Sequence, residues 1–150
     1  MPRLAVAFAF AVCLLACSTT DTSSAASAGP PAAATAPNAM LVEVGGRAFA
    51  THCAACHGTD ARGTGPVATA LVTPPADLTR IAARRGGDFP ADEIAAWIDG
   101  RFAARAHGTR EMPVWGYRFA EGLPEGELTQ ELVRGRILTV VEYLRSIQVP

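Results

Sequence analysis

The residues best suited to chemistry are the two cysteines and the histidine of the segment Cys53-Ala54-Ala55-Cys56-His57. The pattern C-x-x-C-H is typical of segments that hold haem covalently. Each cysteine sulfur would bond to one haem vinyl group, and the histidine would become the proximal ligand of the iron. This segment therefore predicts one covalently bound haem c.

The cysteine pair has two other interpretations. A C-x-x-C pair can be a redox dithiol or half of a zinc site. The dithiol interpretation calls for a strand before the motif, whereas residues 41–51 have a helical pattern. A zinc site calls for a second pair of ligands, and no cysteine follows Cys56. We therefore favour haem attachment.

A second axial ligand for the iron is expected from Met112. It lies in a segment that Pro113 and Gly116 constrain to an irregular loop, from which a thioether can reach the open face of the iron. Methionine is more often packing filler. His107 is the competing ligand, although the glycine after it suggests a turn with a surface histidine. His52 is disfavoured because it belongs to the helical segment that leads into the proximal site.

The N-terminus has the pattern of an export signal. One charge, Arg3, precedes an apolar run that is too short for a membrane-spanning helix of about 20 residues. The run ends in Leu14-Leu15-Ala16-Cys17, which resembles a bacterial lipoprotein signal. Residues 1–16 are thus predicted to be a signal peptide and Cys17 a lipidated N-terminus, on the periplasmic side of a bacterial membrane. The alternative is an ordinary signal with a coincidental cysteine.

The four cysteines of the chain fit these assignments without remainder. Cys13 would leave with the signal, Cys17 would carry lipid, and the pair Cys53 and Cys56 would carry haem. No thiol then remains for a disulfide, although the exported compartment would permit one. The two assignments support each other, because covalent haem attachment is expected outside the cytoplasm.

The rest of the chain divides into a tether and one domain. Residues 17–39 are rich in Ala, Ser, Thr and Pro and are predicted to be a disordered tether, and residues 40–150 form the predicted domain. The formal net charge of −1 gives no indication of nucleic-acid binding or of a polybasic membrane surface. The membrane contact is expected only through the N-terminal lipid.

Helices are predicted on both sides of the haem motif. A helix from Leu41 would run into the motif, with Gly45 allowing a second helix to cross closely. The following Gly58–Val67 segment is expected to be a loop close to the haem, with the backbone acceptor for the His57 ring near Pro66.

The C-terminal half is expected to contain three more helices. Asp77 or Thr79 would cap a short helix to about Arg85, and a second would run from Pro90 to Gly100. Within or beside it, Trp97 is a core residue or a haem-propionate partner, and Arg101 is a propionate partner or a solvated arginine. Thr129 would cap the last helix, whose apolar stripe is expected to cross the first helix near Gly45 and Phe49; the stripe comprises Val133, Ile137, Val140, Val141, Leu144 and Ile147.

Residues 41–147 resemble a class I cytochrome c of the small bacterial kind. The resemblance rests on the haem motif and on segments similar to the family's distal-ligand loop, first helix, last helix and proximal loop: Met112-Pro113-Val114-Trp115-Gly116, Gly45 with Phe49, Tyr143-Leu144 and Gly65-Pro66. It implies an all-α fold of about four to five helices around one haem c, with His57 and Met112 as iron ligands. The lipidated tether is a departure from the freely diffusing members.

The function expected from the resemblance is one-electron transfer by a membrane-tethered carrier between a redox protein donor and acceptor. Six-coordinate iron leaves no position for a small-molecule substrate, so we expect no enzyme activity. Two alternatives remain: a haem c subunit of a larger oxidase or dehydrogenase complex, and a haem-based sensor of small ligands if Met112 does not bind the iron.

Overall fold

The computed structural model describes residues 36–101 and 112–150. The predicted signal peptide, Cys17, nearly all of the tether and His107 lie outside these residues. The described helices belong to one unit, Thr35–Pro150. No helix in the described part of the chain has the length and apolar character needed to cross a membrane.

The first helix leads directly into the haem motif. Helix α1 spans Ala39–His52 and is capped by Asn38, whose Oδ1 accepts from the backbone N–H groups of Met40 and Leu41 at 3.0 and 3.2 Å. It begins two residues before the predicted Leu41, because this side-chain cap satisfies the first N–H groups. Helix α2, Ala54–His57, follows after Cys53 as a single turn.

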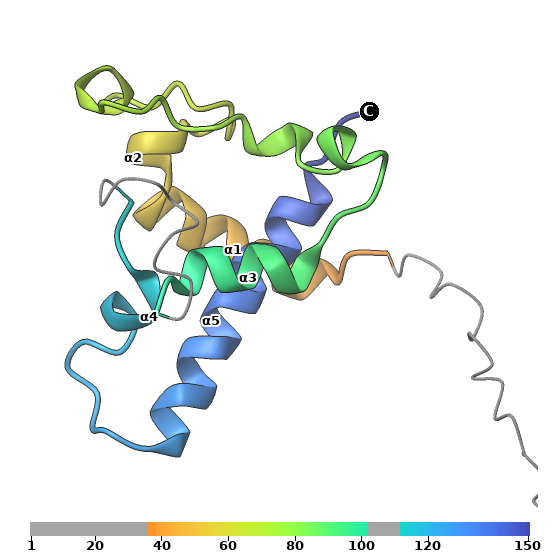
Figure 1. The fold of residues 1–150 in the computed structure, drawn as a ribbon. Coiled ribbons are helices and arrows are strands. Elements are labelled where there is room, and N and C mark those ends of the chain that lie inside the picture. The colour runs from red at the N-terminus through yellow and green to blue at the C-terminus, as the bar shows by residue number, and fades with distance from the viewer. Residues whose placement is uncertain (1–35, 102–111) are drawn as a thin grey trace, which may run out of the picture. The chain divides into compact units, whose positions relative to one another are not determined.

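The last helix, α5, spans Glu127–Ser146 and crosses α1 (Figure 1). Its predicted apolar stripe is buried from Val133 to Leu144. At the crossing, a Cβ built on Gly45 would collide with the carbonyl oxygen of Thr139, so the glycine allows the close approach that was expected. The rings of Phe49 and Tyr143 meet there with centroids 5.1 Å apart.

The start of α5 differs from the prediction. The N-cap is Gly126, with φ of 148°, and Glu127 is the acidic residue of the first turn. Thr129 is buried inside the helix, where its hydroxyl donates to the carbonyl of Pro124 at 2.5 Å. The prediction that Thr129 caps the helix is therefore wrong, because its hydroxyl bonds to the preceding loop and not to the first N–H groups of α5.

Short helices fill the span between α2 and α5. Three 3-10 helices, η1 to η3, span Ala68–Ala70, Leu78–Arg80 and Ala83–Arg85. The single helix predicted to end near Arg85 is thus two short turns, although Asp77 caps the first of them as expected. Helix α3, Ala91–Asp99, begins after Pro90 and ends at Gly100 as predicted. Helix α4, Trp115–Arg118, follows the irregular residues 112–114.

The described residues contain helices, turns and loops but no strand, which confirms the predicted all-α fold. Helices α1 and α3 both pack on α5 (Figure 1). Phe49, Ile98 and Val140 belong to one buried cluster that joins these three helices. The core is therefore built around α5, with the haem motif attached to the end of α1.

Replacing Gly45 by alanine tests the close crossing. Gly45→Ala should lower the free energy of unfolding by about 1–3 kcal/mol, because the new Cβ meets backbone of α5 that cannot move aside. The matched control is Gly135→Ala on α5, where an added Cβ has no neighbour within 4 Å. This control should gain roughly 0.5–1 kcal/mol from helix propensity. Denaturant unfolding followed by circular dichroism measures both, and equal behaviour of the two variants would contradict the crossing.

Candidate functional site

A cavity of about 570 Å³ lies between α1, α3, α5 and the loops that join them. Its volume falls within the roughly 300–1,000 Å³ of small-molecule and cofactor sites. Cys53, Cys56, His57 and Met112 all line it. The structure therefore brings the three residues of the predicted haem motif to the same cavity as the predicted distal ligand, which lies far from them in the sequence.

The walls of this cavity are largely apolar. They come from α1, η2, α3, α5 and the residues between them, and include Phe49, Leu78, Ile81, Ile94, Ile98 and Leu144. Most of these side chains also belong to the buried core of the domain. A ligand in the cavity would therefore lie in a medium of low dielectric constant and touch few polar groups apart from its anchors.

The helical turn of the motif places the two cysteines and the histidine at the cavity wall. The backbone N–H groups of Cys56 and His57 both donate to the carbonyl of Cys53, at 3.1 and 2.9 Å. These bonds close a single turn, so that Cys53, Cys56 and His57 contribute side chains to the same wall. Two covalent anchors and one metal ligand would thus come from five consecutive residues.

The loop after the motif packs behind it, which corrects the prediction that Gly58–Val67 lies against the haem. Gly65 N–H donates to the Cys56 carbonyl at 3.1 Å, and Gly63 N–H donates to the His57 carbonyl at 2.8 Å. A Cβ on Gly65 would lie 2.6 Å from that Cys56 carbonyl carbon, so only glycine permits the approach. The later segment, from Leu71 to Ala76, lines the cavity instead.

The His57 ring is oriented by a backbone carbonyl. Its Nδ1 lies 3.4 Å from the carbonyl oxygen of Ala76. The acceptor was expected near Pro66, but Pro66 is exposed and does not line the cavity. An Nδ1–H that donates to Ala76 leaves Nε2 as the nitrogen available to a metal and raises its basicity.

The chemistry of the thiols argues against a redox dithiol. Burial raises the pKa of the Cys53 thiol to about 12, with a smaller contribution from the neighbouring Cys56. Reactive dithiols have a lowered pKa, because the thiolate is the nucleophile. No group of three His, Cys, Asp or Glu side chains gathers as a metal site in the described part of the chain. Neither alternative interpretation gains support from the structure.

Two further sequence candidates, His52 and Trp97, also line the cavity. The His52 ring packs against both Trp115 and Phe119, with centroids 5.5 and 5.4 Å away, as one member of an aromatic cluster. Trp97 packs with the Arg85 guanidinium 5.2 Å from its ring centroid. Arg84 lines the cavity as well, and no sequence pattern pointed to it.

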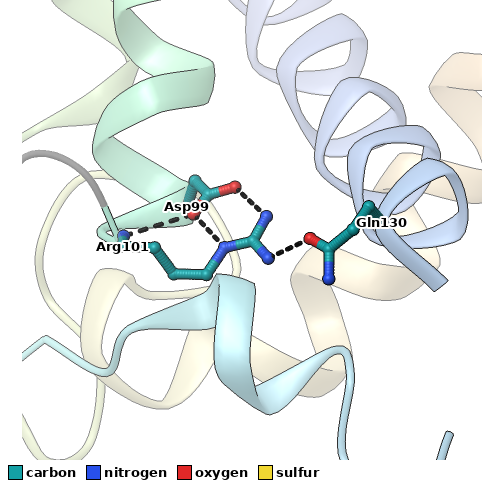
Figure 2. Close-up of polar contacts among 3 residues, drawn as sticks. All are labelled: Asp99, Arg101 and Gln130. Carbon is teal, nitrogen blue, oxygen red and sulfur yellow. Dashed lines mark hydrogen bonds and ion pairs between the residues drawn. The ribbon is translucent and has the colours of Figure 1, made fainter. Parts of the chain in front are cut away.

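Arg101 forms an ion pair that was not predicted from the sequence. It does not line the cavity and is not solvated, since its side chain is only 11% exposed. Its Nε and Nη2 donate to the two carboxylate oxygens of Asp99 at 2.6 and 2.7 Å, and its Nη1 donates to Gln130 of α5 (Figure 2). Both interpretations of Arg101, as a propionate partner and as a surface charge, are therefore corrected.

Asp99 explains why this arginine is needed. It is the last residue of α3, where a negative charge is unfavourable beside the negative end of the helix dipole. Hydrogen bonds from the Arg101 guanidinium lower the pKa of the Asp99 carboxyl and keep it ionised. One sequence feature could have predicted this ion pair: an acidic residue at the C-terminus of a helix, followed directly by glycine and arginine.

Comparison with known proteins identifies the family. The family model described as Cytochrome c matches residues 42–148, well over half of the chain. The chain belongs to the cytochrome c family. A search of curated proteins and a search of solved structures gave no significant match. Cytochromes c bind haem c, an iron porphyrin, covalently, and they transfer electrons.

The described residues of this cytochrome c fit haem c. Two thiols, an imidazole with an oriented ring and a thioether line a largely apolar cavity. Thiols form the thioether bonds of haem c, and imidazole and thioether are its usual axial ligands. The donor set and the apolar walls therefore match the group that the family binds.

Replacing Asp99 by asparagine tests its ion pair through the pH dependence of stability. Asp99→Asn should lower the free energy of unfolding at neutral pH by about 1–3 kcal/mol, because the Arg101 guanidinium loses its charged acceptor. The folded-state pKa of Asp99 lies below its unfolded value of about 3.9, so the stabilisation is complete above that value and is lost as the pH falls through the folded-state pKa.

The difference in stability between the parent and the Asp99→Asn variant should therefore shrink below about pH 4. Urea unfolding of the holoprotein at a series of pH values measures it. A difference that stays constant into acid would show that the carboxylate charge is not what stabilises the fold.

Proposed function

We propose that this protein is a class I, monohaem cytochrome c, anchored by a lipid at Cys17 on the periplasmic side of a bacterial membrane. In this proposal Cys53 and Cys56 attach the haem, and His57 and Met112 bind its iron. The protein carries single electrons between a donor and an acceptor that are themselves redox proteins. It is an electron carrier and not an enzyme.

The observation that carries the proposal is the meeting of Cys53, Cys56, His57 and Met112 on one apolar cavity. When bound, haem c supplies an iron that alternates between the ferrous and ferric states. The chain contributes two covalent anchors, a ring oriented by the Ala76 carbonyl, and a thioether. A thioether ligand and low-dielectric walls both favour the ferrous state and so raise the reduction potential.

The tether is supported by the sequence and by where the domain begins. Helix α1 is capped at Asn38 and the family match starts at residue 42, so the folded domain begins close to the predicted boundary at residue 40. Residues 17–39 would then join the domain to the lipid. A lipid anchor with several acyl chains holds a protein stably at a membrane, whereas one chain does so only reversibly.

Replacing Met112 tests the distal ligand. Met112→Leu should leave one haem attached, as a mass measurement will show, but should abolish the weak long-wavelength absorption band of methionine-ligated ferric haem. The reduction potential should fall, because the thioether no longer favours the ferrous iron. The reduced variant should also bind carbon monoxide rapidly, since one face of the iron is open.

The matched control for Met112→Leu is Met40→Leu, at an exposed methionine in the first turn of α1. It should keep the band and the parent potential. Rapid carbon monoxide binding by the unmutated reduced protein would contradict Met112 ligation and favour a sensor of small ligands.

Replacing Cys17 tests the anchor. Cys17→Ala should move the haem protein from the membrane fraction to the soluble fraction after cell breakage, because no acyl chain is attached. Cys13→Ala changes a cysteine of the same N-terminal region that the proposal assigns to the removed signal. It should leave the protein in the membrane fraction, and retention of the Cys17→Ala variant there would refute the lipid assignment.

A further inference from the structure

The ion pair Asp99–Arg101 lies beside the described irregular residues 112–114, which are called the Met112 loop below. Arg101 is the last described residue before residues 102–111, and Met112 is the first described residue after them. We propose that Asp99, Arg101 and Gln130 are positioning residues that hold the base of the Met112 loop against α3 and α5 and so limit how often Met112 leaves the iron. This inference rests on the Met112 ligation of the proposed function.

The pair is built more firmly than the other ion pairs of the described residues. Its side chains are 11% and 13% exposed, whereas the pair Arg85–Glu93, with the same two-bond geometry, is 35% and 41% exposed. Exposed pairs contribute little to stability, while two parallel charge-assisted bonds away from water are strong and directional. The position of Arg101 is therefore tightly fixed relative to the end of α3.

The segment that follows the Met112 loop packs on the same ion pair through Gly116. A Cβ built on Gly116 would collide with the Nε of Arg101 and with Oδ1 of Asp99, and would lie 2.7 Å from Cδ of Arg101. Gly116 belongs to α4, a few residues after Met112. The missing side chain thus lets the segment that follows Met112 rest directly against the ion pair.

A second contact joins the Met112 loop to the end of α3. Gly100, which has φ of 69° and lies between the paired residues, is close to Val114: a Cβ on Gly100 would be 3.4 Å from Val114 Cγ1. Residues 99–101 and 114–116 therefore pack together as one unit at the base of the loop. Movement of Met112 away from the cavity has to strain or separate this unit.

Gln130 ties the unit to the rest of the domain. It lies on α5 and accepts a hydrogen bond from Nη1 of Arg101 (Figure 2). The same helix supplies Val140 and Leu144 to the cavity. The ion pair consequently fixes the base of the Met112 loop with respect to a helix that forms part of the cavity wall.

The fraction of molecules in which Met112 has left the iron can be measured with imidazole as an added ligand. Imidazole binds the ferric iron only in molecules from which Met112 has dissociated, so its apparent affinity rises in proportion to that population. Weakening the contacts at the base of the loop should raise the population while the domain remains folded. A residue with a purely structural role would change the unfolding midpoint and leave this affinity unchanged.

The experiment is an imidazole titration of the full-length ferric holoprotein in native buffer, followed by loss of the methionine–iron band. Asp99→Asn should bind imidazole about tenfold more tightly than the parent, the order expected for losing one charge-assisted hydrogen bond. Gly116→Ala should produce a similar increase by pushing the pair apart without a change of charge. Gln130→Ala, at an exposed position, should fold readily and give a smaller increase in the same direction.

Two controls separate positioning from other effects. Glu93→Gln removes one carboxylate from the exposed pair on the same helix and should leave the imidazole affinity at the parent value. The double variant Asp99→Asn with Gly116→Ala should show less than the product of the two single effects, because both act on one contact.

Parent affinity in all three single variants, with their methionine band intact, would overturn the inference and leave the proposed function standing. An equal increase in Glu93→Gln would also overturn it, since any lost ion pair would then have the same effect. Absence of the methionine–iron band from the unmutated protein would instead refute the Met112 ligation on which the inference rests.

Discussion

The close crossing of α1 over α5 is the constraint on which the rest of the structure depends. Gly45 allows the backbones to approach, and the rings of Phe49 and Tyr143 pack beside the contact. Because α1 ends at His52 and the motif follows at once, this crossing fixes where Cys53 stands relative to α5. The C-terminal half of α5 can then supply cavity wall opposite the haem motif.

The cavity resolves a difficulty that a small domain faces. A short chain buries a modest fraction of its surface, so it gains little from its own apolar core. Here much of that core faces a cavity whose anchors match haem c, and Phe49, Ile94 and Leu144 are both core residues and cavity walls. Binding of haem would complete the core and at the same time place the iron in an environment that raises its potential.

Hydrogen bonds and an ion pair stabilise the non-helical segments around the site. The loop after the motif is fastened by hydrogen bonds to the carbonyls of Cys56 and His57, while the imidazole meets the Ala76 carbonyl. The ion pair formed by Asp99 and Arg101 packs against Gly116, a few residues after Met112. Buried charge is costly unless paired, so this pair has one well-defined geometry.

The sequence by itself determined the features that depend on residue type and short spacing. These features are the haem motif, the apolar stripe of α5 and the role of Gly45. The motif and the stripe are patterns of residue type and spacing, and the missing Cβ of Gly45 allows a close approach wherever another helix crosses. The resemblance to cytochromes c likewise implied an all-α fold, which the described helices confirm. The family model then matched residues 42–148.

Only the tertiary structure decided which polar groups pair with one another. The acceptor of the His57 ring is Ala76 and not a residue near Pro66, Thr129 fastens a loop and not a helix end, and Arg101 pairs with Asp99. In each case the local sequence allows several hydrogen-bond partners and does not select one of them. The choice among them is made by packing, since a buried polar group bonds to whichever partner the fold brings within reach.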